Sequence, residues 1–389
     1  MTSSAIRTVV LADLHLTRSS PRGVADDLAR FVATHADARI VFAGDLFDFS
    51  ADAPRTLCEP AVEGILGAHA GVRAALARHA DAGGELWLVG GNHDAGIAAP
   101  GFQDAITGAL GLSREGRGRV RITPWFFREG ALHIEHGHRF DPDNAPAHPL
   151  VVGSKSLGVH FTEEFIAPTG AHAYLNATDR TPLELFTAAF RWYGERAPYV
   201  IYRYFWAAFG AMAMSGPFYA ARREFDLGQE RVPRFAEEIG LSAAIVHELI
   251  QLGAPSTLES LPQTFARLYF DRVIATTAMG AGLGAIALGQ RRIGAVSAGF
   301  GALLMAASWA RGHDRYAGTV CDRLARGAAR TTEITGAKLV VFGHTHRDAC
   351  GGNYANTASF AFPGKAPGRP FLEIEGSSET PRAARRYFQ

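Results

Sequence analysis

The chain has 389 residues and a formal net charge of +1, with 39 basic residues balanced by 38 acidic ones. This length predicts one elaborated domain or two domains rather than one simple core. The near-zero charge argues against a dedicated nucleic-acid-binding protein, which neutralises many phosphates with Lys and Arg. The three cysteines are widely spaced and form no CxxC pair, so we expect a reducing compartment and no disulfide framework.

Short apolar runs alternate with segments of helical periodicity at the start of the chain. Runs rich in Val, Leu and Ile predict buried strands, and apolar residues at helical spacing predict helices between them. The expected strands are Ile6–Ala12, Arg39–Ala43, Glu85–Val89, Arg119–Thr123 and Ala131–Glu135, followed much later by Ala337–Phe342, Asn353–Thr357 and Phe371–Ile374. The expected helices between the early strands are Val24–Ala36 and Ala61–Ala80.

This order predicts an α/β layered fold whose chain is interrupted by an insertion. We expect a first part of the core at 1–144, a helical insertion at 145–330 and a second part of the core at 331–389. An insertion of this length is too long for a loop and must have structure of its own.

Five short polar motifs each follow an expected strand. They are Asp13-Leu14-His15, Gly44-Asp45-Leu46-Phe47-Asp48, Gly91-Asn92-His93-Asp94, His136-Gly137-His138 and Gly343-His344-Thr345-His346. The carboxyl ends of strands in an α/β sheet are where loops converge, so we expect these side chains to meet. Hydrolysis of a phosphate ester needs a nucleophile and neutralisation of the charge on the phosphoryl oxygens. Two divalent metals about 4 Å apart supply both, because they activate a hydroxide as the nucleophile and bind the phosphoryl oxygens. The motifs therefore predict a dinuclear phosphoesterase site.

The five motifs resemble those of the calcineurin-like metallophosphoesterase superfamily, whose pattern is D-x-H, G-D-x-x-D/H, G-N-H-D/E, a later H and G-H-x-H. The resemblance covers most of residues 6–140 and 337–359. It implies a layered β-sandwich flanked by helices, with the insertion added to it. It also implies an enzyme that hydrolyses a phosphoester or a pyrophosphate.

The resemblance further implies a role for each polar residue of the motifs. Seven residues would bind metal: Asp13, His15 and His346 one ion, Asn92, His136 and His344 the other, with Asp45 bridging both. His93 would face the phosphate and help to protonate the leaving oxygen, and Asp94 would orient its imidazole. Oxygen and imidazole ligands without thiolates suit two divalent ions of Mn, Fe or Zn, of which Mn is favoured.

Details of the motifs are most similar to the branch that contains the UDP-2,3-diacylglucosamine pyrophosphatases of lipid A synthesis. D-L-H-L, G-D-L-F-D, H-G-H-x-F-D and G-H-T-H-R carry this likeness. Two departures are His93, where that branch usually has Arg, and His138, where it has Asp. We therefore expect an amphiphilic or nucleotide-linked phosphorylated substrate, a small molecule or a lipid. Arg139 and Arg347 are candidates to bind a second phosphate, with ordinary surface arginines as the alternative.

Several polar residues beside the motifs have simpler explanations. Asp48 is expected to orient ligands rather than to bind metal, and His138 to lie next to the ligands or face solvent. Asp141, Asp143 and Asn144 lie in a Pro-rich turn, where Asp and Asn cap the backbone in any case.

The insertion contains an aromatic segment with interleaved arginines, Phe186–Phe209, and two nearly uncharged segments, Val273–Gly289 and Ile293–Ala310. The uncharged pair is compatible with a membrane-spanning hairpin, with a cap that lies in the membrane interface and receives a lipid, or with a buried or dimer-forming helix pair. The Arg291-Arg292 tip argues against spanning from the cytoplasm, so the interfacial cap is favoured.

The expected location is the cytoplasm, with peripheral contact to the inner face of the membrane. The apolar N-terminal run is short and has no cleavage pattern, and its removal would also remove Asp13 and His15.

Two other functions compete with metal-dependent hydrolysis of an amphiphilic substrate. A DNA nuclease of the recombination-repair type shares the D-x-H and G-D-L-F-D/H motifs, but the near-zero charge and the apolar insertion disfavour it. A catalytically retired phosphoesterase that serves as a scaffold would normally have lost ligands, and this chain retains all of them.

Overall fold

The computed structural model describes residues 7–52, 54, 57–152, 155–171, 182–219, 221–312 and 319–389, so Ile6 of the first expected strand lies outside the described part. The chain forms two compact units. The first comprises residues 1–159, 220–256 and 320–389, and the second comprises 160–219 and 257–319. The insertion expected as one segment at 145–330 is helical, without strands among its described residues, but 220–256 and both of its ends belong to the first unit.

The first unit contains two mixed β-sheets. One has the strand order β11-β10-β1-β2-β3-β4 and the other β5-β6-β7-β9-β8. The strands of the first sheet are β1 (Thr8–Leu11), β2 (Arg39–Ala43), β3 (Leu86–Val89), β4 (Val120–Thr123), β10 (Arg369–Glu375) and β11 (Arg382–Phe388). Those of the second are β5 (Phe126–Glu129), β6 (Leu132–Glu135), β7 (Leu339–Phe342), β8 (Asp348–Gly351) and β9 (Tyr354–Thr357).

Pairing within these sheets joins the two ends of the chain. Strands β1 to β4 are mutually parallel, and β10 pairs antiparallel with β1. In the second sheet β6 and β7 are parallel neighbours, with Ile134 opposite Val341, although the insertion separates them in sequence. The last motif is thereby brought to the same sheet edge as the fourth.

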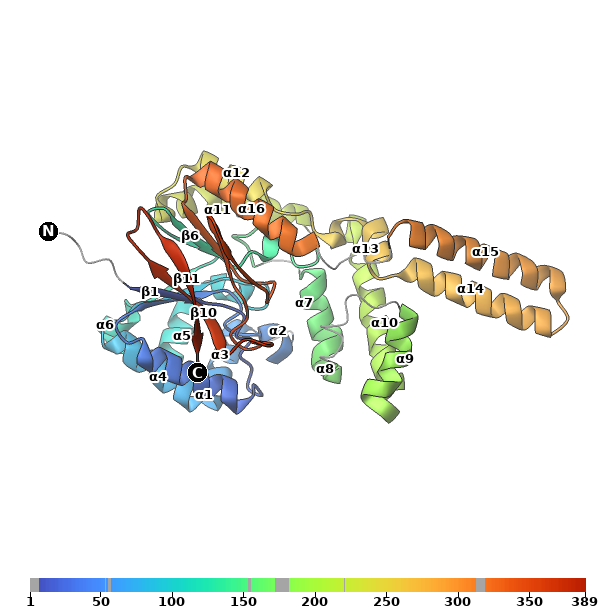
Figure 1. Ribbon diagram of the computed structural model, residues 1–389, viewed down its shortest axis with the longest axis horizontal. Coiled ribbons are helices and arrows are strands. Elements are labelled where there is room, and N and C mark those ends of the chain that lie inside the picture. The colour runs from blue at the N-terminus through green and yellow to red at the C-terminus, as the bar shows by residue number, and fades with distance from the viewer. Residues whose placement is uncertain are drawn as a thin grey trace. The chain divides into compact units, whose positions relative to one another are not determined.

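In Figure 1 the strands lie between two groups of helices. Alternating side chains along the strands build two apolar layers. Val10 and Val41 share a core with Ile134 and Val341 of the second sheet, so the two sheets pack face to face. The opposite face of the first sheet packs against helices, which include α1 (Arg22–Thr34), α3 (Cys58–Ala68), α4 (Ala70–Asp81) and α5 (Phe102–Leu110). The far side of the second sheet packs against α11 (Ala221–Ile239), α12 (Ala243–Gln251) and α16 (Thr319–Thr335). The expected α/β fold is confirmed.

One helix prediction is wrong in its extent. The segment Ala61–Ala80 forms two helices, α3 and α4, which meet at His69. The backbone of His69 leaves the helical region at φ −118° and ψ 64°, and its Nε2 lies 2.7 Å from the carbonyl oxygen of Thr17. A side-chain contact distant in sequence thus ends the helix.

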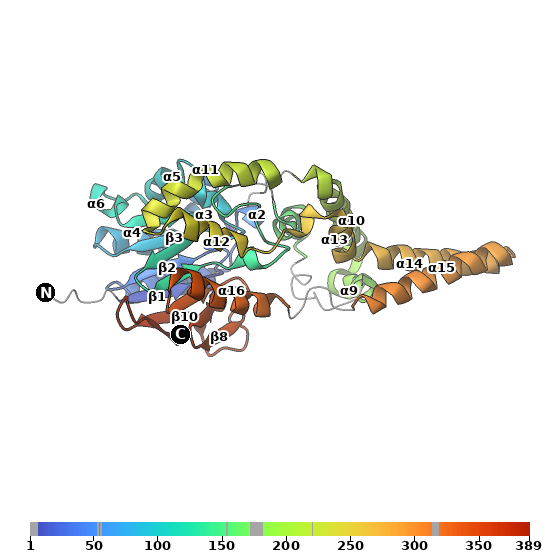
Figure 2. The ribbon, with the colours of Figure 1, turned by 90° about the horizontal axis from the view of Figure 1, so that it is seen from above.

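The second unit is helical (Figure 2). Its core contains Phe165, Ile166, Val200 and Ala207. Its helices are α8 (Ala167–Thr169), α9 (Pro182–Tyr193), α10 (Ala197–Ala213), α13 (Leu261–Arg267), α14 (Phe270–Ala287) and α15 (Arg291–Ala310), with a π-helical turn at Thr162–Ile166. The two segments expected to be uncharged helices form α14 and α15, an antiparallel hairpin. Short helices elsewhere are α2 (Phe49–Asp52), α6 (Arg114–Arg117) and α7 (Leu157–Phe161).

Candidate metal centre

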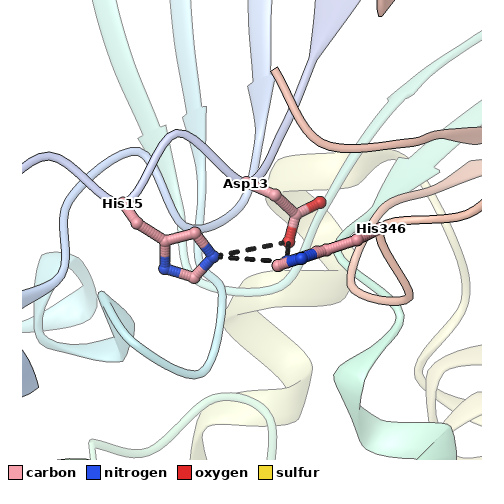
Figure 3. A group of neighbouring side chains, drawn as sticks. All are labelled: Asp13, His15 and His346. Carbon is pink, nitrogen blue, oxygen red and sulfur yellow. Dashed lines mark hydrogen bonds and ion pairs between the residues drawn. The ribbon is translucent and has the colours of Figure 1, made fainter. Parts of the chain in front are cut away.

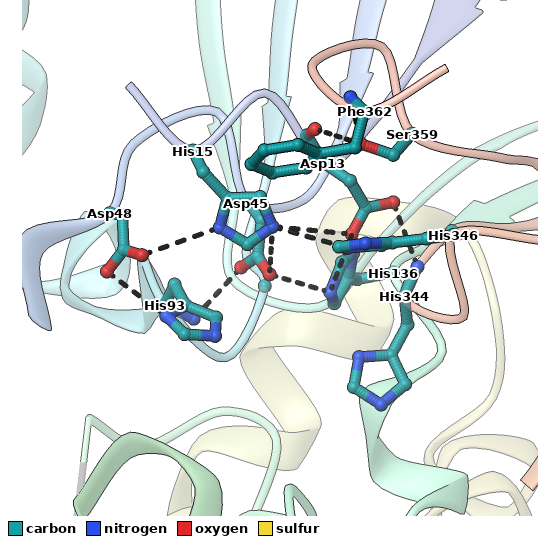
Figure 4. Close-up of polar contacts among 12 residues, drawn as sticks. Asp13, His15, Asp45, Asp48, His93, His136, His344, His346, Ser359 and Phe362 are labelled. Atoms are coloured by element: carbon teal, nitrogen blue, oxygen red, sulfur yellow. Dashed lines mark hydrogen bonds and ion pairs between the residues drawn. The ribbon is translucent and has the colours of Figure 1, made fainter. Parts of the chain in front are cut away.

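The polar motifs converge at one edge of the two sheets (Figure 4). Asp13 follows β1, Asp45 follows β2 and Asn92 follows β3, all from the first sheet. His136 follows β6 and His344 follows β7, both from the second sheet. Because the sheets are packed face to face, these strand ends deliver their loops to a common point.

The backbone at this point is strained. Seven described residues other than glycine have a positive φ, and five of them are predicted metal ligands. These five are Asp13 (56°), His15 (48°), Asp45 (52°), His344 (68°) and His346 (55°). Each such conformation costs about 1–3 kcal/mol and persists only where the surroundings impose it, which is typical of functional sites. The strain is therefore concentrated on the residues that the motifs single out.

Glycine precedes the ligand in three motifs because the loops approach too closely for a side chain. A Cβ at Gly44 would lie 2.4 Å from the ring of His136. A Cβ at Gly91 would lie 2.1 Å from Oδ1 of Asp45, and Gly343 is similarly crowded. These glycines bring neighbouring loops within reach of a shared ion.

One group of facing ligand atoms belongs to Asp13, His15 and His346 (Figure 3). Nε2 of His346 lies 3.2 Å from Oδ1 of Asp13 and 3.4 Å from Nε2 of His15. Oδ2 of Asp13 accepts a hydrogen bond from the backbone of His344, whereas the buried Oδ1 has no hydrogen-bond partner among the described residues. A buried carboxylate oxygen that faces two imidazole nitrogens fits a cation.

The second group surrounds Asp45 and His136. Nε2 of His136 lies 3.1 Å from Oδ2 of Asp45 and 3.2 Å from Oδ1 of Asn92. The same Oδ2 of Asp45 lies 3.9 Å from Nε2 of His15 in the first group. Asp45 thus stands between the two groups, as a bridging carboxylate must.

Charges in this cluster stabilise one another strongly. Burial alone would raise the pKa of Asp45, but the imidazoles of His136 and His93 hold that pKa well below its usual range. Burial would also lower the pKa of His136, yet Asp45 and Asp13 raise it to about 9. The carboxylates thus create a site that favours positive charge, which metal ions can supply in place of protons.

Hydrogen bonds behind two imidazoles determine which ring nitrogen can bind a metal. Nδ1 of His136 lies 3.0 Å from the carbonyl oxygen of Ala43, which only accepts, so Nδ1 carries the proton and Nε2 is left as a ligand. Nε2 of His344 lies 2.9 Å from Oδ2 of Asp141, which leaves Nδ1 of His344 as its ligand atom. A carboxylate or carbonyl behind the imidazole is typical of metal-binding histidines.

The Pro-rich turn contributes more than the sequence indicates. Asp141 bonds His344, and its Oδ2 also accepts from Nδ2 of Asn144 at 2.8 Å. Oδ1 of Asn144 in turn accepts from Nδ2 of Asn92 at 3.2 Å, which leaves Oδ1 of Asn92 directed to His136. Asp141 and Asn144 therefore position ligands. The sequence signal for this role was the H-G-H-x-F-D pattern, in which Phe140 and Asp141 follow the fourth motif.

His93 is held by Asp48, not by Asp94 as expected. Nδ1 of His93 lies 3.1 Å from Oδ1 of Asp48 and 2.9 Å from Oγ of Ser50. Burial would lower the pKa of His93, but Asp48 and Asp45 raise it to about 10. These carboxylates therefore favour the protonated form of the imidazole. The expectation that Asp48 orients other site residues agrees with these contacts.

Asp94 has a structural role and does not orient His93. Its Oδ2 accepts hydrogen bonds from the backbone amides of Leu46 at 2.8 Å and Phe47 at 3.3 Å, and its Oδ1 accepts from Gly91 at 2.7 Å. These bonds tie the second motif to the third. Asp94 contributes to His93 through its charge alone.

The two candidate arginines differ in their surroundings. Arg139 is buried: its Nε donates to Glu135 at 3.0 Å, its Nη1 donates to the carbonyl oxygen of Leu249 at 2.6 Å, and its guanidinium lies 4.1 Å from the ring centroid of Phe140. It cannot reach a substrate phosphate, so that expectation is wrong. Arg347 is exposed beside His346 and stays a candidate.

An aromatic residue at the edge of the site was not anticipated. Phe362 is 61% exposed, and its ring centroid lies 5.9 Å from that of His346 at 20° and 6.1 Å from that of His15. Ser359 places it, because Oγ of Ser359 donates to the carbonyl oxygen of Asp13 and accepts from the amide of Phe362. No motif includes Phe362, which is why the sequence did not indicate it.

In comparisons with known proteins, no protein-family model matches this chain and no curated protein matches it. What the structure shows directly is a set of buried Asp and His side chains positioned to bind a metal ion.

Proposed function

We propose that this protein is a metal-dependent phosphoesterase of the calcineurin-like metallophosphoesterase type. The observation that carries the proposal is that Asp13, His15, Asp45, His136 and His346 bring their ligand atoms together in overlapping groups, and four of these five have strained backbones. The ring of His344 belongs to none of these groups and is held by Asp141 beside them. Two sheets packed face to face between layers of helices agree with the layering that the motif resemblance implies. Because no family model and no curated protein matches the chain, the proposal is supported by the motifs and by the geometry of the site.

The donor set fits two divalent ions of Mn, Fe or Zn, with Mn favoured. Asp13, His15 and His346 would hold one ion, Asn92, His136 and His344 the other, and Asp45 both. When bound, the metals supply a nucleophile at neutral pH and neutralise the phosphoryl oxygens.

The protein's own contribution to the chemistry is proton transfer. Hydrolysis adds water across a P–O bond, so the leaving oxygen requires a proton. His93 is the candidate donor, because Asp48 and Ser50 hold its Nδ1 and the Asp48 carboxylate favours the protonated imidazole. The proton on Nε2 of His93 is then the one available to the leaving group.

The substrate is expected to be amphiphilic or nucleotide-linked. The exposed Phe362 offers an apolar face beside His346, and Arg347 offers a cation on the same loop. An aromatic face and a guanidinium next to the metal ligands suit a phosphate joined to an apolar or planar group.

A hydrolysis screen on the metal-reconstituted protein tests the proposal. Simple phosphodiesters, nucleotide-sugar pyrophosphates and phospholipids are compared with Mn²⁺ or Zn²⁺, with and without detergent. We expect turnover of at least one class, and its near-complete loss in Asp45→Asn. Asp104→Asn, an exposed carboxylate in α5, serves as the control. Wild-type protein that binds metal and hydrolyses none of these substrates, or Asp45→Asn with full turnover, would contradict the proposal.

A further inference from the structure

The two helices of the hairpin α14–α15 meet through small residues. Ala275 and Gly282 are buried on α14, and Gly294 and Gly301 are buried on α15, seven residues apart in each helix. A Cβ at Gly282 would lie 2.5 Å from the backbone nitrogen of Ala298, and a Cβ at Gly301 would lie 2.6 Å from the carbonyl oxygen of Ala275. The helix backbones are therefore in direct contact.

Large apolar side chains point away from this interface. Exposed fractions are highest for Leu288 (84%), Val296 (74%), Leu303 (74%), Ile293 (67%), Leu283 (63%), Trp309 (58%) and Phe300 (57%). A helix pair in water gains stability by burying such side chains between its helices. In lipid that gain vanishes, and close packing of glycine and alanine holds helices together. The hairpin has the arrangement suited to lipid.

Charge is confined to the two ends of the hairpin. No Asp, Glu, Lys or Arg lies between Arg272 and Arg291, or between Arg292 and Arg311. The uncharged residues 293–310 of α15 rise about 27 Å as a helix, close to the roughly 30 Å of a bilayer's hydrocarbon core. The uncharged helical residues 273–287 of α14 rise about 22 Å, and residues 288–290 form the turn at the tip. Helix α15 has a mean hydropathy of 1.6 over its most apolar window, of which 17% is buried.

These observations distinguish among the environments that could cover the apolar surface of the hairpin: the membrane interface, a second copy of the chain or the bilayer core. A helix lying in the membrane interface needs a polar face along its length, and neither helix has one. A second copy of the chain could cover the row formed by Val296, Phe300 and Leu303. It would leave exposed apolar residues on the other face, because Leu283 and Leu288 lie about 140° apart around α14.

We propose that the hairpin α14–α15 inserts across the hydrocarbon core of a lipid bilayer. The stripe of small residues holds the two helices together, and the outward side chains face the acyl chains. Arg291 and Arg292 at the tip reach the phosphates of the far headgroup layer, to which their charge is complementary. This arrangement replaces the interfacial cap favoured by the sequence, and it does not depend on the proposed chemistry. The Arg291-Arg292 tip does not decide against spanning, because Arg272 and Arg311 place the same number of arginines at the base of the hairpin.

The first experiment is flotation with vesicles of phosphatidylethanolamine and phosphatidylglycerol. Val296→Asp combined with Leu303→Asp places two carboxylates near the middle of α15, at exposed positions where a soluble fold tolerates them. Wild-type protein is expected to float, and the double variant to float at least tenfold less. Leu57→Asp combined with Leu227→Asp adds the same charge at exposed apolar positions outside the hairpin and is expected to float like wild type.

The second experiment reads the depth of insertion from native residues. Trypsin added outside sealed vesicles cleaves after Arg291 or Arg292 only if the tip remains on the outer surface. We expect protection of this site in vesicles and cleavage after detergent is added. Cleavage at equal rates in both conditions would overturn the spanning arrangement.

Two other results would also overturn the proposal. One is wild-type protein that stays in the aqueous fraction, or a double variant that floats as wild type does. The other is a detergent-free oligomer of the wild type that the double variant converts to monomers while flotation is unchanged. In that case the apolar row is an interface between copies of this chain.

Discussion

Single residues decide which atoms at the centre face a metal. Asp141 behind His344 and Ala43 behind His136 each bond one ring nitrogen and leave the other as a ligand. Neither ring could turn without breaking its hydrogen bond. The protein's own hydrogen bonds therefore set the orientation of both imidazoles.

Removal of the acceptor behind His344 should weaken metal binding. We expect Asp141→Ala to lower the affinity for Mn²⁺ by about 10- to 100-fold, because the His344 ring loses the bond that orients it. Isothermal titration calorimetry measures the change. Asp141→Asn keeps an acceptor oxygen and should retain most of the affinity. Equal affinity of Asp141→Ala and wild type would show that Asp141 only caps its turn.

A second prediction at this scale concerns Phe362. Because the ring is exposed beside His346 and carries no group that could transfer a proton, we expect it to contribute to substrate binding alone. Phe362→Ala should raise KM several-fold on an amphiphilic substrate and leave kcat nearly unchanged, the pattern of lost uniform binding. Phe362→Tyr keeps the ring and is the control. A loss confined to kcat would assign Phe362 to the chemical step.

At the scale of elements, Arg139 joins the end of β6 to helix α12. It bridges Glu135 and the carbonyl oxygen of Leu249, and its own carbonyl oxygen accepts from the amide of Ala254. The chain after α12 is thereby attached beside His136, a candidate metal ligand. A residue that sequence reasoning assigned to substrate binding instead holds part of the insertion on the core.

Breaking this connection should cost stability. Arg139→Met leaves the carboxylate of Glu135 buried without its guanidinium partner, with only Trp125 and His133, among the described residues, still within hydrogen-bond distance of it. We therefore expect the free energy of unfolding to fall by about 3–5 kcal/mol. Urea unfolding measures the loss, and the exposed Arg347→Met should change stability by less than about 0.5 kcal/mol. No loss in Arg139→Met would mean that Glu135 is satisfied by other groups.

The same pair predicts a pH dependence. Burial would raise the pKa of Glu135, but Arg139 and His133 lower it to about 2, below its value of roughly 4.3 in an unfolded chain. A lowered pKa contributes stability that is present above the unfolded value and is lost as pH falls through the folded one. The stability difference between wild type and Arg139→Met should thus shrink between about pH 4 and pH 2.

Strands were predictable where their burial leaves a run or an alternation of apolar residues in the sequence. The apolar runs of β1 to β4, β6, β7, β9 and β10 were anticipated because both faces of these strands, or one, are buried. The edge strands β5, β8 and β11 were missed. Most residues of β11 and β8 are polar, charged or small, and β5 is four residues long with only its first two apolar, so none of the three gives a clear periodic pattern. They become strands because a neighbour pairs with them.

For the whole molecule, metal binding should be linked to folding. Ions that bind only the folded site stabilise it by about 2.7 kcal/mol at a hundredfold excess over Kd. Chelation by EDTA should therefore lower the Tm, and Mn²⁺ should restore it, as read by calorimetry. Asp45→Ala removes the carboxylate that both proposed ions share and should make the Tm far less sensitive to both. A Tm that is independent of EDTA and Mn²⁺ in wild type would argue against the metal centre.

The sequence by itself determined the α/β class and the residue types at the strand ends, because burial periodicity and motif spacing are local properties. It also located the two uncharged helices of the hairpin. The reaction itself stays a proposal.

Only the tertiary structure decided which partners these residues have. Asp48 rather than Asp94 holds His93, Arg139 is buried, and Asp141 bonds His344. The outward direction of the hairpin's large side chains was likewise not readable from composition. The physical reason is that such contacts join segments far apart in the chain, as when β6 and β7 pair across the whole insertion.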